Sequence, residues 1–283
     1  MKTYLDCYPC FLRQALDAAR RAGADERQQH TILDRVLDAL RQNEISSTPP
    51  EIGDRVHRIV RQETGDSDPY RAAKEASTHQ ALALYPRLKS LLVEANDPLE
   101  TAVRLSIAGN IIDLSAVGEY DLVDTVERVL AQPFAVDNGA AFREALSEAG
   151  RVLYLADNAG ETVFDRLLIE TLDVPVIYAV KGGPTLNDAT REDALAAGVD
   201  RVAEVVSTGS DAPGTILHRC SEEFRQLYDK AELIIAKGQA NYETLSEEGA
   251  RVFFLLQVKC PVIARDVGVP VGSIVLKQSG GVR

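Results

Sequence analysis

From residue 151 onward, the chain alternates strand-sized apolar runs with segments of helical periodicity. The strand-sized runs are Arg151–Ala156, Val174–Val180, Arg201–Val206, Glu232–Ala236, Arg251–Leu256 and a shorter one at Ser273–Leu276. Between them, apolar residues recur three and four positions apart, as on one face of a helix. The predicted helices are Glu161–Leu172, Ala189–Ala197, Pro213–Ala231 and Tyr242–Glu248. Strands that are apolar along their whole length and separated by helices indicate a mainly parallel sheet that is covered on both faces. An α/β fold is therefore predicted for this half.

The first 150 residues show helical spacing almost throughout. The predicted helices are Cys10–Ala22, Asp25–Gln42, Glu51–Thr64, Tyr70–Val93, Pro98–Val117, Asp121–Leu130 and Gly139–Gly150. Proline- and glycine-containing stretches separate most of them, and no segment before residue 150 has the pattern of a strand. We therefore expect two regions, an all-helical one at 1–150 and an α/β one at 151–283.

Composition excludes several classes of function. The 283 residues carry a formal net charge of -12, and a surface so negative repels nucleic-acid phosphates and anionic lipid. No apolar run resembles a signal peptide or is long enough to span a membrane. We therefore expect a cytoplasmic protein with no nucleic-acid or membrane partner and with reduced cysteines. The sequence leaves the oligomeric state open.

Small, polar or charged residues follow each of the five main strands, and ligands bind at the carboxyl ends of strands in an open parallel sheet. Asp157, Asn158 and Asp188 supply the oxygen atoms that magnesium or manganese prefers, with cobalt or nickel as alternatives. Each also has a plainer interpretation, since Asp157 and Asn158 suit a turn and Asp188 suits a helix N-cap. Their joint occurrence at neighbouring strand ends favours a metal site.

Other residues at these strand ends suit a phosphate group. Lysines can neutralise its charge, glycines let backbone N–H groups approach it, and glutamates can transfer protons. Asn110 and Asp113 lie three apart on one face of a predicted helix that could cover the pocket, although they could equally satisfy each other or the backbone. The candidate catalytic residues are Asp157, Glu161, Lys237 and Glu243. The candidate substrate-binding residues are Asn110, Asp113, Gly160, Lys181, Gly182, Gly238, Asn241 and Lys259.

The cysteines form a second candidate group. Cys7 and Cys10 make a CxxC motif at a predicted helix start, where a thiol is acidified and can be redox-active. Two thiolates do not complete a zinc site, but Cys260 could be a third ligand of a second metal. Simple burial of the thiols is the plain alternative.

Four motifs in order, AGNIIDLS, DNAGE, KGGPTLNDAT and IAKGQANYE, resemble those of the damage-control phosphatases, the acidic-residue-methyltransferase-like family. The CxxC motif and LLQVKCPVIA are similar to its prokaryotic subgroup. The resemblance implies a helical amino-terminal region packed over the active site of a three-layer, Rossmann-like α/β/α domain. It implies a divalent metal held by Asp157, Asn158 and Asp188, and it favours a site role for Asn110 and Asp113. The arginine motif of eukaryotic members is absent, and Lys259 stands in its place.

We therefore predict a metal-dependent phosphatase that acts on small phosphate monoesters, such as sugar phosphates or damaged phosphometabolites, by attack of a metal-activated water. One alternative is an S-adenosylmethionine-dependent carboxyl methyltransferase, but the DNAGE turn has a single glycine and the turn after the second strand is basic. The other is a non-enzymatic metal or redox sensor that uses the CxxC motif.

Overall fold

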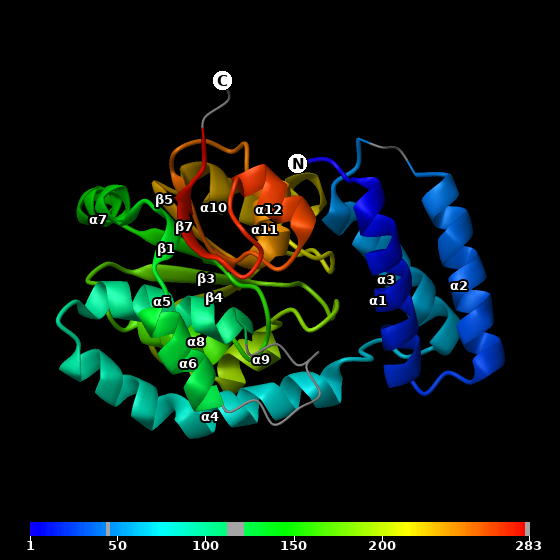
Figure 1. Ribbon diagram of the computed structural model, residues 1–283, viewed down its shortest axis with the longest axis horizontal. Coiled ribbons are helices and arrows are strands. Elements are labelled where there is room, and N and C mark those ends of the chain that lie inside the picture. The colour runs from blue at the N-terminus through cyan, green and yellow to red at the C-terminus, as the bar shows by residue number, and fades with distance from the viewer. Residues whose placement is uncertain (44–45, 112–121, 281–283) are drawn as a thin grey trace.

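The computed structural model describes residues 1–43, 46–111 and 122–280 (Figure 1). In these ranges one seven-stranded sheet has the order β1-β7-β6-β5-β2-β3-β4. The β6–β7 pair is antiparallel and the other pairs are parallel. The strands are β1 Phe134–Asp137, β2 Val152–Leu155, β3 Val176–Val180, β4 Glu204–Ser207, β5 Leu233–Lys237, β6 Val252–Gln257 and β7 Ile274–Gln278.

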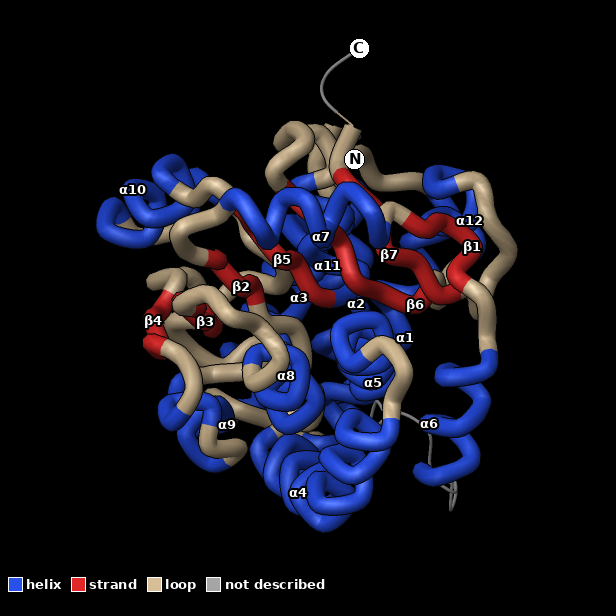
Figure 2. The backbone as a smooth tube through the Cα atoms, turned by 90° about the vertical axis from the view of Figure 1, so that its left-hand side faces the viewer, coloured by secondary structure: helices blue, strands red, loops and turns tan. Residues whose placement is uncertain are grey.

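The helices form a bundle beside the sheet and a layer on each of its faces (Figures 1 and 2). The bundle consists of α1 Tyr8–Arg21, α2 Glu26–Arg41 and α3 Pro49–Thr64. The remaining helices are α4 Arg71–Glu94, α5 Pro98–Ile111, α6 Leu122–Ala131, α7 Gly139–Glu148, α8 Thr162–Ile169, α9 Arg191–Ala196, α10 Glu222–Lys230, α11 Gly238–Leu245 and α12 Pro261–Val267. Short 3-10 turns lie at Leu5–Cys7, Val199–Arg201 and Leu217–Arg219. No described helix is both long and apolar enough to cross a membrane.

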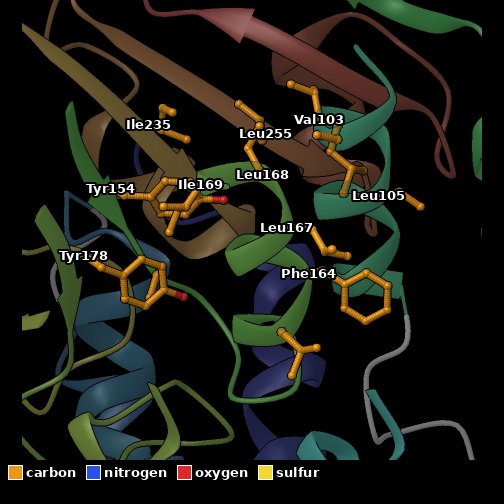
Figure 3. Close-up of a cluster of buried hydrophobic side chains, with 14 of the residues drawn as sticks. Val103, Leu105, Tyr154, Phe164, Leu167, Leu168, Ile169, Tyr178, Ile235 and Leu255 are labelled. Atoms are coloured by element: carbon orange, nitrogen blue, oxygen red, sulfur yellow. The ribbon is translucent and has the colours of Figure 1, made fainter. Parts of the chain in front are cut away.

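Each face of the sheet has its own core because successive strand residues point to opposite sides. On one face, Tyr154 and Ile235 pack against α5 and α8 (Figure 3). On the other face, their neighbours Leu153 and Ile234 pack against α10, α11 and α12. The wholly apolar strands of the sequence are thus explained by burial on both sides.

The bundle has a separate apolar core and clear boundary signals. Thr48 and Glu51 form a capping box ahead of α3, Pro49 occupies its first turn, and Gly65 ends it in the left-handed conformation at φ 70°. A capping box at Asp25 starts α2 in the same way. These local signals are why the helix starts predicted from the sequence lie close to the observed ones.

The α/β fold with a mainly parallel sheet and a helical amino-terminal region is confirmed. The absence of a strand before residue 150 is wrong, because β1 pairs in parallel with β7. This strand is four residues long, lies at the sheet edge and is only half-buried, so it carries no long apolar run. The division of the chain at residue 150 stays a prediction, although β1, α4 and α5 all join the sheet layers.

Two helix boundaries also differ. The single helix expected between Pro213 and Ala231 is a 3-10 turn followed by α10, which begins after Ser221 because that side chain accepts a hydrogen bond from the Phe224 N–H. Helix α11 begins at Gly238, directly after β5, rather than at Tyr242. The left-handed backbone of Gly238 turns the chain without an intervening loop.

Candidate active site

The ends of β2 and β3 are joined by backbone hydrogen bonds that bring the predicted metal ligands together. The Ala189 N–H donates to the Asp157 carbonyl at 2.7 Å, and the Ala159 N–H donates to the Asn187 carbonyl at 2.8 Å. Asn158 and Asp188 form an antiparallel bridge between them. The prediction that Asp157, Asn158 and Asp188 share one edge of the sheet therefore agrees with the geometry.

The carboxylate of Glu161 orients two asparagine amides at this edge. Asn158 donates from Nδ2 to Glu161 Oε1 at 2.6 Å, and Asn110, at the end of α5, donates to the same oxygen and to Asp157 Oδ2 at 2.9 Å. An amide that donates from its nitrogen presents its oxygen elsewhere. The Asn110 Oδ1 atom is buried and has no hydrogen-bond partner among the described residues. Buried polar atoms are normally hydrogen-bonded, so this oxygen is available to coordinate a cation.

Negative charge accumulates at the same place. Burial, together with the charges of Glu161 and Asp188, raises the pKa of Asp157 well above its usual value, and Lys259 and Lys181 oppose the shift. Lys181 lies 3.4 Å from Asp188 and donates to the Gly214 carbonyl. A bound divalent cation would offset this crowding, so the donor set fits a hard metal ion.

Lys237 lies beneath the site. It is fully buried and donates to Glu161 Oε2 at 2.9 Å and Asp165 Oδ1 at 2.7 Å. Burial lowers its pKa, but the charges of Asp165 and Glu161 outweigh burial and leave that pKa raised. Tyr154 and Tyr178 each donate to Asp165 at 2.7 Å. In this geometry Lys237 holds Glu161 in place.

A cleft of about 1030 Å³ separates this edge of the sheet from the bundle. Asn110, Asp157, Asn158 and Asp188 line it on the sheet side, and Phe11 of α1 lies on the bundle side. The helical region therefore forms one wall of the cleft, as expected of a region that packs over an active site.

The predicted residues divide into two groups. Those that line the cleft are Asn110, Asp157, Asn158, Asp188, Glu243, Lys259 and the three cysteines Cys7, Cys10 and Cys260. Those that support it from behind are Gly160, Glu161, Lys181, Gly182, Lys237, Gly238 and Asn241. Asn241, for example, donates to the carbonyls of Ala156 and Lys237 at 3.1 and 2.8 Å. Asp113 lies outside the described residues.

The three predicted glycines are required by close packing. A Cβ atom at Gly238 would lie 1.8 Å from Asp157 Oδ2, at a backbone φ of 73°. One at Gly160 would lie 2.6 Å from Ser77 Oγ, and one at Gly182 would lie 2.6 Å from the backbone of Gly209. Gly238 therefore lets the start of α11 approach the central carboxylate of the site.

Glu243 differs from the other acidic residues of the cleft. Burial raises its pKa to about 7, against the opposing effects of a hydrogen bond from Gln239 and the amino-terminal charge. The amino group of Met1 donates to the Glu243 carbonyl at 2.8 Å. A carboxyl that titrates near neutrality at the edge of a cleft suits proton transfer.

The three cleft thiols lie at two helix starts. Cys7 and Cys10 begin α1, and Cys260 caps α12, with its sulfur accepting from the Ile263 N–H at 3.5 Å. Across the described part of the chain, no group of three or more His, Cys, Asp or Glu side chains is arranged to hold a metal. The thiols thus do not form the second metal site in this conformation, whereas the site at Asp157 also depends on amide oxygens.

Sequence reasoning missed several supporting residues. Asp165 lies four positions after Glu161 on α8, and this spacing within an apolar helix is a signal that could have identified it. The Ser106 hydroxyl donates to Asp165 Oδ1 at 3.0 Å, and the Ser106 carbonyl accepts a hydrogen bond from Lys237. Leu186, in the loop before Asp188, was missed as well. Its distinguishing feature is a positive φ of 47°, which the type of its side chain does not reveal.

The chain is similar to known proteins along nearly its whole length. The family model of the damage-control phosphatase ARMT1-like domain matches residues 3–275. A damage-control phosphatase of Pyrococcus horikoshii is 36% identical over 99% of both chains, and one of Archaeoglobus fulgidus is 36% identical over 96% of this chain and 97% of its own length. A crystal structure of a P. horikoshii protein of the same family superposes with a TM-score of 0.90, at 34% identity over 99% of each chain.

We predict that Gly238→Ala disrupts the site, whereas Gly249→Ala does not. Both glycines have positive φ, but a Cβ atom at Gly249 would meet nothing within 4 Å. The free energy of unfolding of the Gly249 variant should fall by only about 1 kcal/mol, the cost of placing alanine in the left-handed backbone conformation. The Gly238 variant must also displace Asp157, so its free energy of unfolding should fall further and its phosphatase turnover should be lost. Urea unfolding and turnover assays measure both. Equal behaviour of the two variants would contradict the close approach.

Proposed function

This chain belongs to the damage-control phosphatase ARMT1-like family, and we propose that it is a divalent-metal-dependent hydrolase of small phosphate monoesters. Phosphatase activity is the part that its relatives support. The main observation behind metal dependence is the cluster in the cleft, where Asn158 and Asp188 are bridged and Asn110 donates from Nδ2 to Asp157, while the buried Asn110 Oδ1 atom has no hydrogen-bond partner in the part of the chain that the structure describes.

These four side chains are the proposed ligands, with magnesium or manganese as the cation. They offer oxygen donors, which hard cations prefer, whereas softer metals prefer sulfur and imidazole ligands. Such an ion supplies Lewis acidity to a phosphoryl oxygen and favours ionisation of a bound water. Glu161 keeps the amides of Asn110 and Asn158 turned so that their oxygens remain available.

The chain's own residues orient the reaction. Asp157 is held by Asn110 and by the close backbone of Gly238, so its carboxylate is fixed where it can position an attacking water. The same confinement disfavours Asp157 as the nucleophile, since attack on phosphorus requires the carboxylate to advance. Lys259 lines the cleft, and its positive charge lowers the pKa of Asp157 against the larger effect of burial. It is the proposed counter-charge for the phosphoryl group.

Glu243 is the proposed general acid. With a pKa of about 7 it still holds its proton at slightly acidic to neutral pH, and it lines the cleft together with the ligand cluster. A proton donated from its carboxyl group to the leaving oxygen would help sugar-type alcohols depart, because they are poor leaving groups.

The size of the cleft suits small metabolites. At about 1030 Å³ it is at the upper end of ordinary small-molecule pockets, so it has room for a sugar phosphate together with water. Arg13, Gln14 and Arg21 of α1 face the cleft from the bundle and can contact the organic part of the substrate. Discrimination among sugar phosphates would then reside in α1, and the chemistry in the sheet.

The methyltransferase alternative is weaker on this geometry. The residue that follows β3 is Lys181, which is buried and paired with Asp188, rather than an acidic residue exposed to a ribose. A methyl-transfer assay with S-adenosylmethionine, run beside the phosphatase assay, distinguishes the two activities.

We expect chelation with EDTA to abolish turnover of p-nitrophenyl phosphate and added magnesium or manganese to restore it. Asp157→Asn and Asp188→Asn each keep the side-chain size but remove a charge. Both should lower turnover by about 100-fold or more and weaken manganese binding measured by calorimetry. Asp229→Asn, at an exposed position of α10, serves as the matched control. Wild-type turnover by either cleft variant would reject the proposed site.

We predict that Glu243→Gln changes both stability and rate with pH. Folding raises the pKa of Glu243 from 4.5 to about 7, so the folded chain retains a proton that the unfolded chain releases. The contribution of this group to stability therefore falls as pH rises through this interval, by about 3 kcal/mol in total. In the glutamine variant this loss should disappear.

Rate measurements separate the catalytic role of Glu243 from its effect on stability. Hydrolysis of a sugar phosphate should fall by about 100-fold in Glu243→Gln, whereas p-nitrophenyl phosphate, whose leaving group needs no proton, should be spared. In the wild type, the sugar-phosphate rate should decline above about pH 7, as the acid form is lost. Glu247→Gln, at an exposed position beyond the end of α11, is the control. Equal loss with both substrates would contradict the general-acid role.

A further inference from the structure

Leu186 occupies a strained position beside the proposed ligands. Among the residues whose structure is described, it is the only non-glycine residue with a positive φ, at 47°. A side chain in this region of backbone space costs about 1–2 kcal/mol, and such strain persists only where the surroundings enforce it. Leu186 lies two residues before Asp188, so whatever enforces its conformation also sets the ligand loop.

The bundle holds this residue. The Leu186 side chain packs against the apolar core of α1, α2 and α3, and every other residue of that cluster lies within residues 1–70. The same loop is held by Arg61 of α3, which donates to the Pro184 carbonyl at 3.1 Å and to Asp211 at 3.1 Å. Leu186 is thus the apolar contact of the ligand loop with the bundle.

The loop passes this constraint to the ligands through short backbone links. The Asp188 N–H donates to the Thr185 carbonyl at 3.0 Å, which closes a turn around Leu186. On either side of Asp188, the Asn187 carbonyl accepts from Ala159 and the Ala189 N–H donates to Asp157. A change in the backbone of Leu186 must therefore move Asp188 relative to Asp157.

We propose that Leu186 is a positioning residue through which the packing of α1–α3 and cation binding at Asp157, Asn158 and Asp188 stabilise each other. This rests on the proposed function. Coupling of this kind is reciprocal, so the cation must protect the bundle from opening by the same factor by which bundle packing tightens cation binding. The bundle thereby acts as an energetic part of the metal site in addition to forming a wall of the cleft.

The test measures binding and exchange rather than turnover. In the full-length wild type, saturating manganese should slow amide hydrogen exchange in α1–α3, as well as at the ligands. In Leu186→Ala and Leu186→Gly, manganese affinity should fall about 10-fold and the slowed exchange in the bundle should disappear. Leu186→Met keeps an apolar anchor and should restore both. Leu33→Ala is the matched control, because Leu33 of α2 is also a partly buried leucine that packs against the same core.

The outcomes are distinguishable. If the wild type binds no divalent cation, the proposed function fails. If it binds manganese but exchange in α1–α3 is unchanged, the coupling is absent and the role of Leu186 is overturned, even if the variants fail to fold. Manganese affinity in Leu186→Ala equal to that of Leu33→Ala overturns it as well.

The cleft thiols carry a second and independent inference. Cys7 and Cys260 belong to segments that touch, because Arg265 of α12 pairs with Asp6 and lies 5.5 Å from the centre of the Tyr4 ring. Burial raises the pKa of Cys7 against a backbone hydrogen bond at Tyr4 that lowers it, and the nearby charges of Glu243, Cys260 and Cys10 add to the rise. The sulfur of Cys260 accepts from the Ile263 N–H at 3.5 Å and from Gln239 Nε2 at 3.6 Å, and both Cys7 and Cys260 line the cleft.

We infer that peroxide joins Cys7 to Cys260 in a disulfide across the mouth of the cleft. The Cys260 thiolate attacks one peroxide oxygen, the O–O bond breaks, and hydroxide leaves and is protonated to water. The resulting sulfenic acid is attacked by the Cys7 sulfur, so the S–S bond forms as the S–O bond breaks. The departing hydroxide takes the Cys7 proton and leaves as a second water. Two thiols are thereby oxidised and one peroxide is reduced to two waters.

Peptide mapping of the full-length protein tests this assignment. After treatment with one equivalent of hydrogen peroxide and trypsin digestion without reductant, we expect Thr3–Arg13 joined to Cys260–Arg265. The linked product should persist in Cys10→Ser and in the control Cys220→Ser, whose thiol is buried away from the cleft, and should vanish in Cys7→Ser and Cys260→Ser. Thiol reductant should reverse it. A Cys7–Cys10 bond within Thr3–Arg13, or only sulfinic and sulfonic products, overturns the inference.

Discussion

The site depends on the buried ion pairs of Lys237. This ammonium group is surrounded by Glu161, Asp165 and the Ser106 carbonyl, with no exposed surface. Removing one partner of a buried pair leaves an uncompensated charge, at about 3–5 kcal/mol. Because breaking the ion pair is so costly, Lys237 holds Glu161 in place, and Glu161 in turn orients the amides of Asn110 and Asn158. The orientation of the proposed ligand oxygens thus originates one layer below the cleft, among side chains that do not line it.

Two parts of the fold meet at this network. The sheet brings the ends of β2, β3 and β5 side by side, as parallel topology requires. Helix α5 then delivers Asn110 from the first half of the chain, and the bundle delivers the opposite wall of the cleft. Neither half contains a complete site. The family match likewise spans both halves, from residue 3 to residue 275.

The sequence predicted the features that follow from local pattern. Strand-sized apolar runs gave six of the strands, and polar residues at their ends gave Asp157, Asn158 and Asp188 at one edge. Prediction from the sequence failed where contacts between distant segments determine what a residue does. Lys237 has the same side chain whether it contacts phosphate or lies beneath the site, and only packing against Asp165 distinguishes the two. The positive φ of Leu186 is likewise not predictable from a leucine, whose packing partners in the bundle core lie more than a hundred residues away in the sequence.

The pKa values of two cleft carboxyls, Asp157 and Glu243, are raised for different reasons, and this difference suits the different roles proposed for them. The pKa of Asp157 is raised by burial and by the neighbouring carboxylates Glu161 and Asp188, so a positive charge placed among them would favour the ionised form of Asp157. The pKa of Glu243 is raised mainly by burial, with a smaller contribution from the charge of Asp266, and its carboxylate accepts a hydrogen bond from Gln239. A cation at the ligand cluster would therefore ionise Asp157 while leaving the Glu243 proton largely in place. One cleft can thus hold an anion and an acid at the same pH, as phosphomonoester hydrolysis requires.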